Sequence, residues 1–426
     1  MGTSGHASVR VVERITVGQV RSVSVPGSKS VANRALVCAA LAPGTSILRG
    51  VPDGDDSAAM VTALRELGFA VEVSYGSTDV IAVTGGRPAG GAAWAELAGT
   101  TSRFLIALAA TGSAPITVDG GPPLRRRPMT PLLDAVRAIG ARVETADGHL
   151  PVTVCGPAHG GTVTVPGDVS SQFLSALMLI APTLPDGISI AVTGHLVSRP
   201  YVDLTARVMA AFGHEAVDLT EGSITVATGR YRARTFEVEP DASSASYPLA
   251  IAAATCSTVV VPGLRADSSQ GDIALLGLLE RMGCRVETSG DVTVTGPVSL
   301  SGIDVDMADI SDLVPTVAVL ACLATGPTRI RGVGFIRAKE SDRLGDLAHE
   351  LRRCGALVTE TEDGLDIEPS SALSGARVAT HHDHRLAMAL AVLGTAIGGV
   401  EIADPAVVGK SWPSFWTMLD TFAADQ

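Results

Sequence analysis

The stretch VPGSKSVANR (residues 25–34) decides how the rest of the chain is interpreted. An alternating run before it predicts a strand, and the apolar run at residues 35–41 after it predicts a buried helix. A helix that begins behind small polar residues offers free backbone N–H groups and a positive dipole end to an anion. Lys29 and Arg34 add full charges at this end. Taken alone, the stretch fits an anion site and an ordinary Ser-capped helix equally well.

The features of this stretch return about every seventy residues along the chain. A helix-like segment that stops at glycine and precedes a strand recurs five times, at Gly68, Gly140, Gly213, Gly283 and Gly355. Polar residues before an Ala-rich helix recur six times, in PGSKSVANRAL, LAGTTSRFLIAL, PGDVSSQFLSALML, PDASSASYPLAIAAA, ADISDLVPTVAVLACL and HHDHRLAMALAVL. A constant spacing of this length indicates a repeat architecture.

Each repeat is predicted as strand, buried helix, strand, half-buried helix and two strands, which makes an α/β fold of six βαβαββ units. We expect three units per lobe. The first lobe would span residues 24–240 and the second residues 1–23 plus 241–426, with two hinge crossovers between them. Residues 9–17 would complete the last unit. Symmetry within a lobe would gather the starts of its three buried helices on one face, and opposed faces would form an anion-binding cleft.

Composition limits the class of partner. The net charge of −12 argues against nucleic acid or a membrane surface as the main partner, and the apolar runs are too short to span a bilayer. Six isolated cysteines form no CxxC or Cys/His pair, so we expect no zinc site or disulfide framework and a reduced, cytoplasmic setting. No secretory signal is visible in residues 1–9. Ring-shaped DNA clamps also have sixfold repeats, but they need basic helices, and these helices are Ala-rich.

The basic residues are almost all arginine. Of 32 basic residues only Lys29, Lys339 and Lys410 are lysines, and each lies in a polar stretch that we interpret as a loop. Lysine supplies a compact, mobile and titratable charge that arginine cannot imitate. The three positions are therefore candidates for a binding or catalytic role, although codon bias with leftover surface lysines explains them as well.

These motifs, together with LVSRPYVD, SSQGD, AKESDRL and GKSWP, resemble the enolpyruvyl transferase family over residues 25–413. Within it they are most similar to the members that act on shikimate 3-phosphate. The family fold is a two-lobe, inside-out α/β barrel of six βαβαββ repeats. The resemblance implies that the chain joins shikimate 3-phosphate to phosphoenolpyruvate and releases phosphate, without a metal or an organic cofactor. It also implies small-molecule substrates only and a cytoplasmic monomer.

The resemblance further implies roles for single residues. Asp312 would be the base on the attacking 5-hydroxyl group, Glu340 would protonate the methylene carbon, and His384 would support Glu340. Lys29 would complete the catalytic set, between the two substrates. The residues implied for shikimate 3-phosphate are Lys29, Ser30, Arg34, Ser170, Ser171, Gln172, Ser198, Tyr201, Asp312 and Lys339. Those implied for phosphoenolpyruvate are Lys29, Gly99, Arg127, Gln172, Arg343, Arg385 and Lys410. Phosphoenolpyruvate carries a carboxylate and a phosphate, so a pocket with several arginines suits it.

Three positions depart from the commoner family pattern. Leu97, Phe104 and Phe335 stand where many members have Asn, Pro and Asn respectively. In the triple-Arg loop Arg127 is the favoured phosphoenolpyruvate contact and Arg125 the lesser candidate.

Several alternatives stay open. Asp312 could cap the helix that follows it, the pair Asp383 and His384 could be a cap, and Asp342 fits better as a residue that orients Arg343 than as a reacting group. The alternative enzyme is the sister transferase acting on UDP-N-acetylglucosamine, or a paralogue of a specialised pathway. The sister enzyme usually carries a reactive Cys in a flexible loop, and no Cys here lies in a candidate loop.

Overall fold

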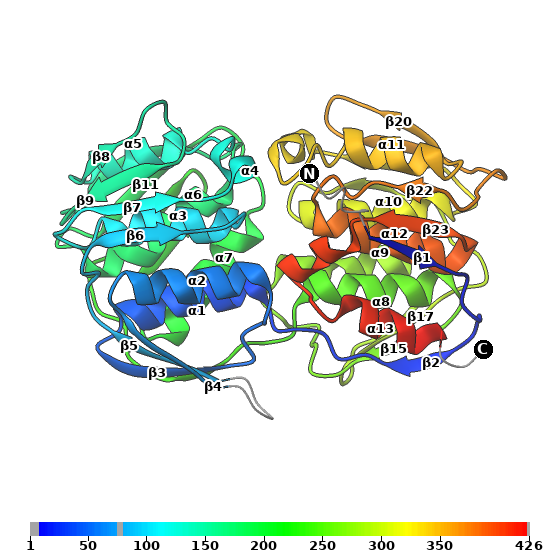
Figure 1. The fold of residues 1–426 in the computed structure, drawn as a ribbon, viewed down its shortest axis with the longest axis horizontal. Helices are drawn as coiled ribbons and strands as arrows, with labels where there is room; N and C mark the ends of the chain where they lie inside the picture. The colour runs from blue at the N-terminus through cyan, green and yellow to red at the C-terminus, as the bar shows by residue number, and fades with distance from the viewer. Residues whose placement is uncertain (1–7, 75–79, 424–426) are drawn as a thin grey trace, which may run out of the picture. The chain divides into compact units, whose positions relative to one another are not determined.

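The computed structural model describes residues 8–74 and 80–423. The chain divides into two compact units (Figure 1). The middle unit is residues 27–239, and the terminal unit is residues 1–26 plus 240–426, so it contains both chain ends. Residues 1–7, 75–79 and 424–426 lie outside the described residues, and so do the parts of the predictions that fall on them.

The division lies close to the predicted lobe boundaries, but residues 24–26 and Pro240 belong to the terminal unit. Backbone hydrogen bonds explain the difference. Asp241 N–H donates to the Pro26 carbonyl at 2.9 Å within the terminal unit, and Ser28 N–H donates to the Glu239 carbonyl at 2.8 Å within the middle unit. Gly27 is required where the chain enters the middle unit, because a Cβ atom there would overlap the Gly50 carbonyl oxygen.

The middle unit alternates strands and helices. Its strands are β3 (Gly44–Arg49), β4 (Ala70–Ser74), β5 (Val80–Gly85), β6 (Gly91–Trp94), β7 (Ile116–Asp119), β8 (Arg142–Glu144), β9 (Val152–Cys155), β10 (Gly161–Pro166), β11 (Ile188–Thr193), β12 (Val217–Thr220), β13 (Ser223–Val226) and β14 (Thr235–Glu237). Its helices are α1 (Lys29–Leu41), α2 (Asp55–Glu66), α3 (Gly99–Ala109), α4 (Pro122–Arg125), α5 (Thr130–Ala138), α6 (Ser171–Ile180), the 3-10 helix η1 (Ala181–Thr183) and α7 (Pro200–Ala211).

The terminal unit follows the same alternation. Its strands are β1 (Val9–Val12), β2 (Val20–Ser22), β15 (Thr258–Val261), β16 (Arg285–Glu287), β17 (Val292–Thr295), β18 (Asp304–Asp306), β19 (Thr328–Arg331), β20 (Leu357–Glu360), β21 (Leu365–Glu368), β22 (Arg377–Val378) and β23 (Val400–Ala403). Its helices are α8 (Ala242–Ala254), η2 (Gly271–Ala274), α9 (Leu275–Arg281), η3 (Ser311–Leu313), α10 (Val314–Cys322), η4 (Gly334–Ala338), α11 (Gly345–Arg353), α12 (His384–Ile397), η5 (Pro405–Lys410) and α13 (Phe415–Ala423).

The strands form small mixed sheets with a common pairing pattern. In the middle unit the orders are β14-β3-β5-β4, β6-β7-β9-β8 and β10-β11-β13-β12. In each of these sheets the first pair is parallel and the other two are antiparallel. The terminal unit has two sheets with this pattern, β2-β15-β17-β16 and β18-β19-β21-β20, and a three-stranded sheet β1-β23-β22.

Two sheets are completed by strands from far along the chain. The strand β2, which lies before the predicted lobe boundary at residue 24, pairs in parallel with β15 of the terminal unit. The strand that pairs with β3 is β14, at residues 235–237. In the last sheet β1 pairs with β23, with Val12 opposite Val400, so the prediction that residues 9–17 contribute there is confirmed for Val9–Val12.

Each of the two units contains three buried helices that begin in or near the Ala-rich runs of the sequence. In the middle unit α1, α3 and α6 contact one another, and in the terminal unit α8, α10 and α12 do so. Residues 31–41 of α1 are all buried. The amphipathic helices, such as α2 and α11, bury one face only. Over the described residues, no helix is both long enough and apolar enough to cross a membrane.

Candidate active site

Lys29 is the first residue of α1, not a loop residue as the sequence suggested. The side chain of Ser28 caps this helix by accepting a hydrogen bond from Val31 N–H. Lys29 Nζ lies 2.8 Å from an oxygen of Asp56, which stands in the first turn of α2. The Asp56 carbonyl accepts a hydrogen bond from the Thr101 hydroxyl of α3 at 3.1 Å. The starts of α1, α2 and α3 are therefore linked around a lysine–aspartate pair.

Two arginines lie against the start of α3. A Cβ atom added to Gly99 would stand 2.5 Å from Arg127 Nη1 and 3.2 Å from Arg103 Nη1, so both guanidinium groups lie against this glycine and a larger residue would displace that of Arg127. Arg103 also donates to the side-chain oxygen of Gln172 at the start of α6, and its guanidinium group lies 5.1 Å from the Phe173 ring centre. Arg103, which the sequence prediction did not include, thus connects the starts of α3 and α6.

Arg34 is buried on the inner side of α1. Its Nε donates to the Thr205 hydroxyl at 2.8 Å, and its two other nitrogens donate to the Ser30 and Tyr201 carbonyls and to the Ser175 hydroxyl at 2.8–3.2 Å. Only 1% of its surface is exposed. Arg34 therefore holds together the segments that carry Ser30 and Tyr201, and this geometry favours a positioning role over the direct contact that we predicted.

The predicted serine loops lie at helix starts in the same unit. Ser170 caps α6 by accepting a hydrogen bond from Gln172 N–H at 3.3 Å. Ser171 is the first residue of that helix and is buried. Ser198 has a positive φ of 54° and precedes α7, where Tyr201 is the second residue. The small polar residues thus gather at the N-terminal ends of α6 and α7.

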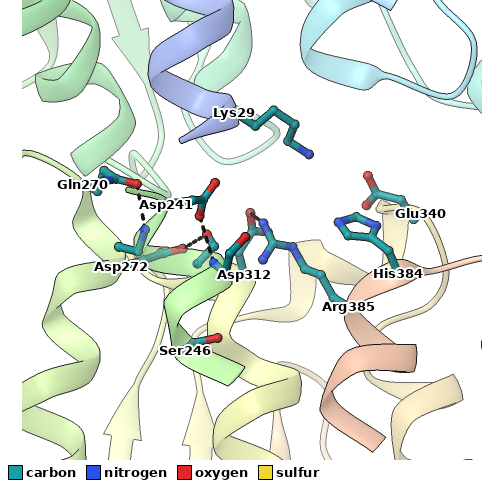
Figure 2. Close-up of polar contacts among 12 residues, drawn as sticks. Lys29, Asp241, Ser246, Gln270, Asp272, Asp312, Glu340, His384 and Arg385 are labelled. Atoms are coloured by element: carbon teal, nitrogen blue, oxygen red, sulfur yellow. Dashed lines mark hydrogen bonds and ion pairs between the residues drawn. The ribbon is translucent and has the colours of Figure 1, made fainter. Parts of the chain in front are cut away.

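In the terminal unit a buried arginine organises three carboxylates. Arg343 donates to Asp383 at 2.7 Å, to Asp312 at 2.9 Å and to Glu340 at 2.7 Å. Its side chain is 2% exposed. Arg385 Nη2 donates to the second oxygen of Asp312 at 2.7 Å, a contact drawn in Figure 2. The predicted acid, the predicted base and two predicted cations are therefore parts of one ionic network.

The network sets the protonation of its members. Burial by itself would raise the pKa of Asp312, but the charges of Arg385 and Arg343 outweigh burial and hold that pKa below its ordinary value. Burial would lower the pKa of Arg343, but the carboxylates of Asp383, Glu340 and Asp312 raise it instead. Asp312 is consequently ionised at neutral pH, as a group that accepts a proton must be.

Glu340 has two cationic neighbours. One carboxylate oxygen accepts a hydrogen bond from Arg343, and the other lies 3.0 Å from Lys410 Nζ. Lys410 ends the 3-10 helix η5 and is 8% exposed, so it is also not the loop residue that we expected. Lys339 directly precedes Glu340, and its Nζ lies 5.7 Å from the ring centre of Phe335.

The cap alternatives have different outcomes. Asp312 lies in the short helix η3 and caps no helix, whereas Asp383 caps α12 by accepting from Arg385 N–H at 2.9 Å. His384 is the first residue of α12 and is 1% exposed. The prediction that Asp342 orients Arg343 is wrong. Asp342 pairs with Arg337 at 3.0 Å and accepts backbone N–H groups at the start of α11, because its chain turns away from the network.

Comparisons with known proteins identify the family. A model of the family EPSP synthase (3-phosphoshikimate 1-carboxyvinyltransferase) matches residues 16–419. The chain belongs to the EPSP synthase family. It is 43% identical over 404 residues to a 3-phosphoshikimate 1-carboxyvinyltransferase of Nostoc punctiforme, with 93% of this chain and 95% of the relative covered. The corresponding protein of Syntrophobacter fumaroxidans is 42% identical, with 96% and 99% covered.

Solved structures of the EPSP synthase family also have this fold. The structure of EPSP synthase from Acinetobacter baumannii superposes with a TM-score of 0.80 at 26% identity, over 97% of this chain and 98% of that one. The family resemblance drawn from the motifs is thus confirmed, and so is the mixed α/β fold class.

Asp272 of this chain is, after Arg103, the second residue near the site that the sequence prediction missed. It is 3% exposed and accepts a hydrogen bond from the Ser243 hydroxyl, beside the cap of α8 by Asp241 (Figure 2). Burial, followed by the charge of Asp312, raises the pKa of Asp272 to about 7. The motif SSQGD was noticed in the sequence, but burial next to another carboxylate depends on tertiary packing.

Two of the residues that depart from the family pattern, Phe104 and Leu97, pack against other parts of the middle unit. Phe104 is 1% exposed, and its ring centre lies 5.4 Å from the Arg34 guanidinium carbon. Leu97 packs beside Gly121, where an added Cβ atom would meet its methyl group at 2.9 Å. Arg125 pairs with Asp119 at 2.5 Å, whereas Arg127 is buried beside Gly99. The preference for Arg127 over Arg125 therefore has a geometric basis.

Proposed function

We propose that the chain transfers the enolpyruvyl group of phosphoenolpyruvate to the 5-hydroxyl group of shikimate 3-phosphate and releases phosphate. Membership of the EPSP synthase family supports the reaction. Within the chain, the observation that carries it is the network in which Arg343 joins Asp312 and Glu340. It brings together the two carboxylates that an addition and an elimination need.

Asp312 and Glu340 have opposite tasks in the proposed reaction. In the addition, the 5-hydroxyl oxygen bonds to C2 of phosphoenolpyruvate and its proton passes to Asp312, while a protonated Glu340 gives a proton to the methylene carbon. In the elimination, the new methyl group loses a proton to Glu340 and the carbon–carbon double bond forms again as the C–O bond to phosphate breaks. The phosphate leaves with the proton that Asp312 took from the hydroxyl group, which restores both carboxyl groups to their starting states. Arg343 and Arg385 favour the ionised form of Asp312 but also make it a weaker base, so proton transfer to Asp312 requires that these arginines turn to the substrate carboxylate.

The cations of the network fit the anionic groups of phosphoenolpyruvate. We assign its carboxylate to Arg343 and Arg385, because a guanidinium group matches a carboxylate with two parallel hydrogen bonds. We assign its phosphate to Lys410, to Arg127 and to the backbone of Gly99, against which the Arg127 guanidinium group lies. In this structure both arginines pair with Asp312, and Lys410 pairs with Glu340. Binding would therefore replace these protein carboxylates with the carboxylate and the phosphate of phosphoenolpyruvate.

Shikimate 3-phosphate is assigned to polar groups at helix starts. Ser170 and Ser171 begin α6, where free N–H groups and the helix dipole favour the 3-phosphate. Gln172, Ser198, Tyr201 and Lys339 complete the proposed set. Arg34 acts through Ser30 and Tyr201, whose carbonyls it holds.

We also propose that the six small sheets are copies of one βαβαββ repeat, three per lobe, in the inside-out barrel of the family. The recurring pairing pattern of the sheets supports this arrangement. We further propose that the protein acts as a cytoplasmic monomer. Sedimentation of the purified chain distinguishes the two states, because a monomer has the chain mass of 43.4 kDa and a dimer has twice that mass.

Phosphate release tests the proposed reaction. The purified chain is mixed with phosphoenolpyruvate and either shikimate 3-phosphate or UDP-N-acetylglucosamine. We expect release that depends on shikimate 3-phosphate and none above background with the nucleotide sugar. Release with UDP-N-acetylglucosamine alone would instead assign the sister activity, and release with neither acceptor would remove the proposal.

A further inference from the structure

A cavity of about 620 Å³ lies within the middle unit, away from the helix starts described above. It is lined by residues that stand within four positions after the C-terminal ends of the three buried helices: Pro43 after α1, Thr111 after α3, and Pro182 and Leu184 after α6. Its size falls in the range of small-molecule sites, which is roughly 300–1,000 Å³. None of the residues assigned to the transferase reaction is among those that line it.

The same backbone contact builds the wall of the cavity in each repeat. The carbonyls at the helix ends accept hydrogen bonds from the segment after the last strand of the repeat: Ala40 from Gly86 N–H at 2.9 Å, Ala110 from Ala158 N–H at 2.8 Å, and Pro182 from Gly229 N–H at 2.7 Å. Because these bonds satisfy carbonyls at the negative helix ends, the protein itself reduces their repulsion of an anion.

Basic side chains come from the three wall segments. Arg87 directly follows Gly86, Arg230 directly follows Gly229, and His159 directly follows Ala158; all three line the cavity. No aspartate or glutamate is among the lining residues. A chain with a net charge of −12 has therefore placed three basic groups and no acid around one cavity.

The corresponding segment of the terminal unit lacks this feature. After β17, the turn Gly296-Pro297-Val298-Ser299 corresponds to Gly156-Pro157-Ala158-His159 after β9, and none of its four residues is basic. In both turns the glycine lies against a carbonyl at the end of the buried helix, because an added Cβ atom would meet the Ala252 oxygen at 2.0 Å or the Ala110 oxygen at 2.2 Å. The helix-end contact is thus possible without a basic residue beside it. The contact needed for the fold does not explain why arginine follows it at two positions of the middle unit.

We propose that this cavity binds a small anion with two or more carboxylate or phosphate groups. Each guanidinium group of Arg87 and Arg230 presents a planar pair of donors to one oxyanion group, and the His159 ring supplies a third contact. Thr228 lines the same cavity, and its hydroxyl group adds an uncharged donor, whereas the hydroxyl groups of Thr111 and Thr183 already donate to the Leu108 and Ile180 carbonyls. Bound at the C-terminal ends of α1, α3 and α6, such an anion adds a ligand site to the unit that is separate from the transferase residues.

The test needs a signal from the cavity itself, because an anion would also bind to the cationic groups of the proposed active site. The ring of His159 provides that signal. The full chain is labelled in its histidine rings, and the His159 resonance is identified by its loss in His159→Gln. Citrate, a tricarboxylate, and inorganic pyrophosphate are titrated separately. We expect at least one of them to shift the His159 resonance saturably, and the comparison of the two distinguishes a carboxylate from a phosphate ligand.

Variants connect that shift to the arginines. Arg87→Gln and Arg230→Gln should each weaken the binding seen at His159 by about tenfold, which corresponds to the loss of one charge-assisted contact. Arg142→Gln removes one exposed positive charge from β8 of the same unit and should leave the anion affinity measured at His159 unchanged. All three variants should release phosphate at the wild-type rate without added citrate or pyrophosphate. A His159 resonance that neither anion shifts, or a shift that both cavity variants retain at full affinity, would overturn the proposal.

Discussion

At the scale of single residues, Arg343 has the largest influence on the proposed site. Its side chain is almost fully buried, and three carboxylates accept its hydrogen bonds. Removing one partner of a buried ion pair leaves an uncompensated charge, which typically costs about 3–5 kcal/mol. Substitutions of the network should therefore retain side-chain shape, so that loss of chemistry is separated from loss of fold.

Asp312→Asn tests the assigned base. The amide keeps the size of the side chain but cannot accept the hydroxyl proton, so we expect phosphate release to fall by about 10²-fold or more. Asp342→Asn is the matched control, because that carboxylate pairs with Arg337 outside the network. Circular dichroism should show folded protein for both. If Asp312→Asn turns over like the Asp342→Asn control, Asp312 is not the base.

Gly99→Ala tests the close contact with the two arginines. The new methyl group would lie 2.5 Å from Arg127 Nη1, so the guanidinium group must move. We expect the KM for phosphoenolpyruvate to rise by about tenfold, the effect of one weakened charge-assisted contact. Gly277→Ala in α9 has open space around the added atom and should leave KM unchanged. An unaltered KM in Gly99→Ala would separate Arg127 from phosphoenolpyruvate binding.

Asp272 should make stability depend on pH. In the unfolded chain this carboxyl ionises near its ordinary pKa of 3.8, whereas in the folded chain burial keeps it protonated up to about pH 7. The folded state then binds more protons, so this group makes the unfolding free energy fall as pH rises from about 4 to 7. Asp272→Asn should lose that part of the slope in urea unfolding. Exposed Asp267→Asn should retain it, and parallel curves for wild type and Asp272→Asn would contradict the assignment.

At the scale of elements, the sequence was most informative about helix starts. The polar residues before each Ala-rich run predicted the starts of α1, α3, α6, α8 and α12. What lies opposite a helix start was not predictable. Arg103 stands one turn after Gly99, so a shared helix face could have been noticed, but its contact with Gln172 of α6 depends on tertiary packing. Asp342 was misassigned because neighbours in sequence need not point toward each other.

Asp241→Ala tests the cap of α8. Asp241 accepts a hydrogen bond from Ser244 N–H at 2.9 Å at the start of that buried helix. Losing a cap of this type costs about 1 kcal/mol, so we expect the unfolding free energy to fall by about that amount. Chemical denaturation measures it, with exposed Asp267→Ala as control in the same unit. Equal stability of the two variants would show that the helix start is satisfied in another way.

At the scale of the whole molecule, the seventy-residue spacing was enough to predict a recurring order of strands and buried helices. It did not predict that β3 is completed by β14, or β15 by β2. These pairs join segments about 190 and 240 residues apart, and a strand of three residues carries too little pattern to identify its neighbour. The need for glycine at position 27 could not be predicted either, because it comes from the close approach of the Gly50 carbonyl in the folded chain.

In the proposed reaction, the methylene carbon of phosphoenolpyruvate gains a proton in the addition and loses one in the elimination, with Glu340 as the proton carrier. The most direct measurement is mass spectrometry of the product formed in D₂O from phosphoenolpyruvate and shikimate 3-phosphate. Addition places a deuteron on that carbon, and elimination removes a proton or a deuteron from the resulting methyl group. We predict a product with deuterium in its enolpyruvyl methylene group. A fully converted product without deuterium in that group would show that the methylene carbon is not protonated during the reaction.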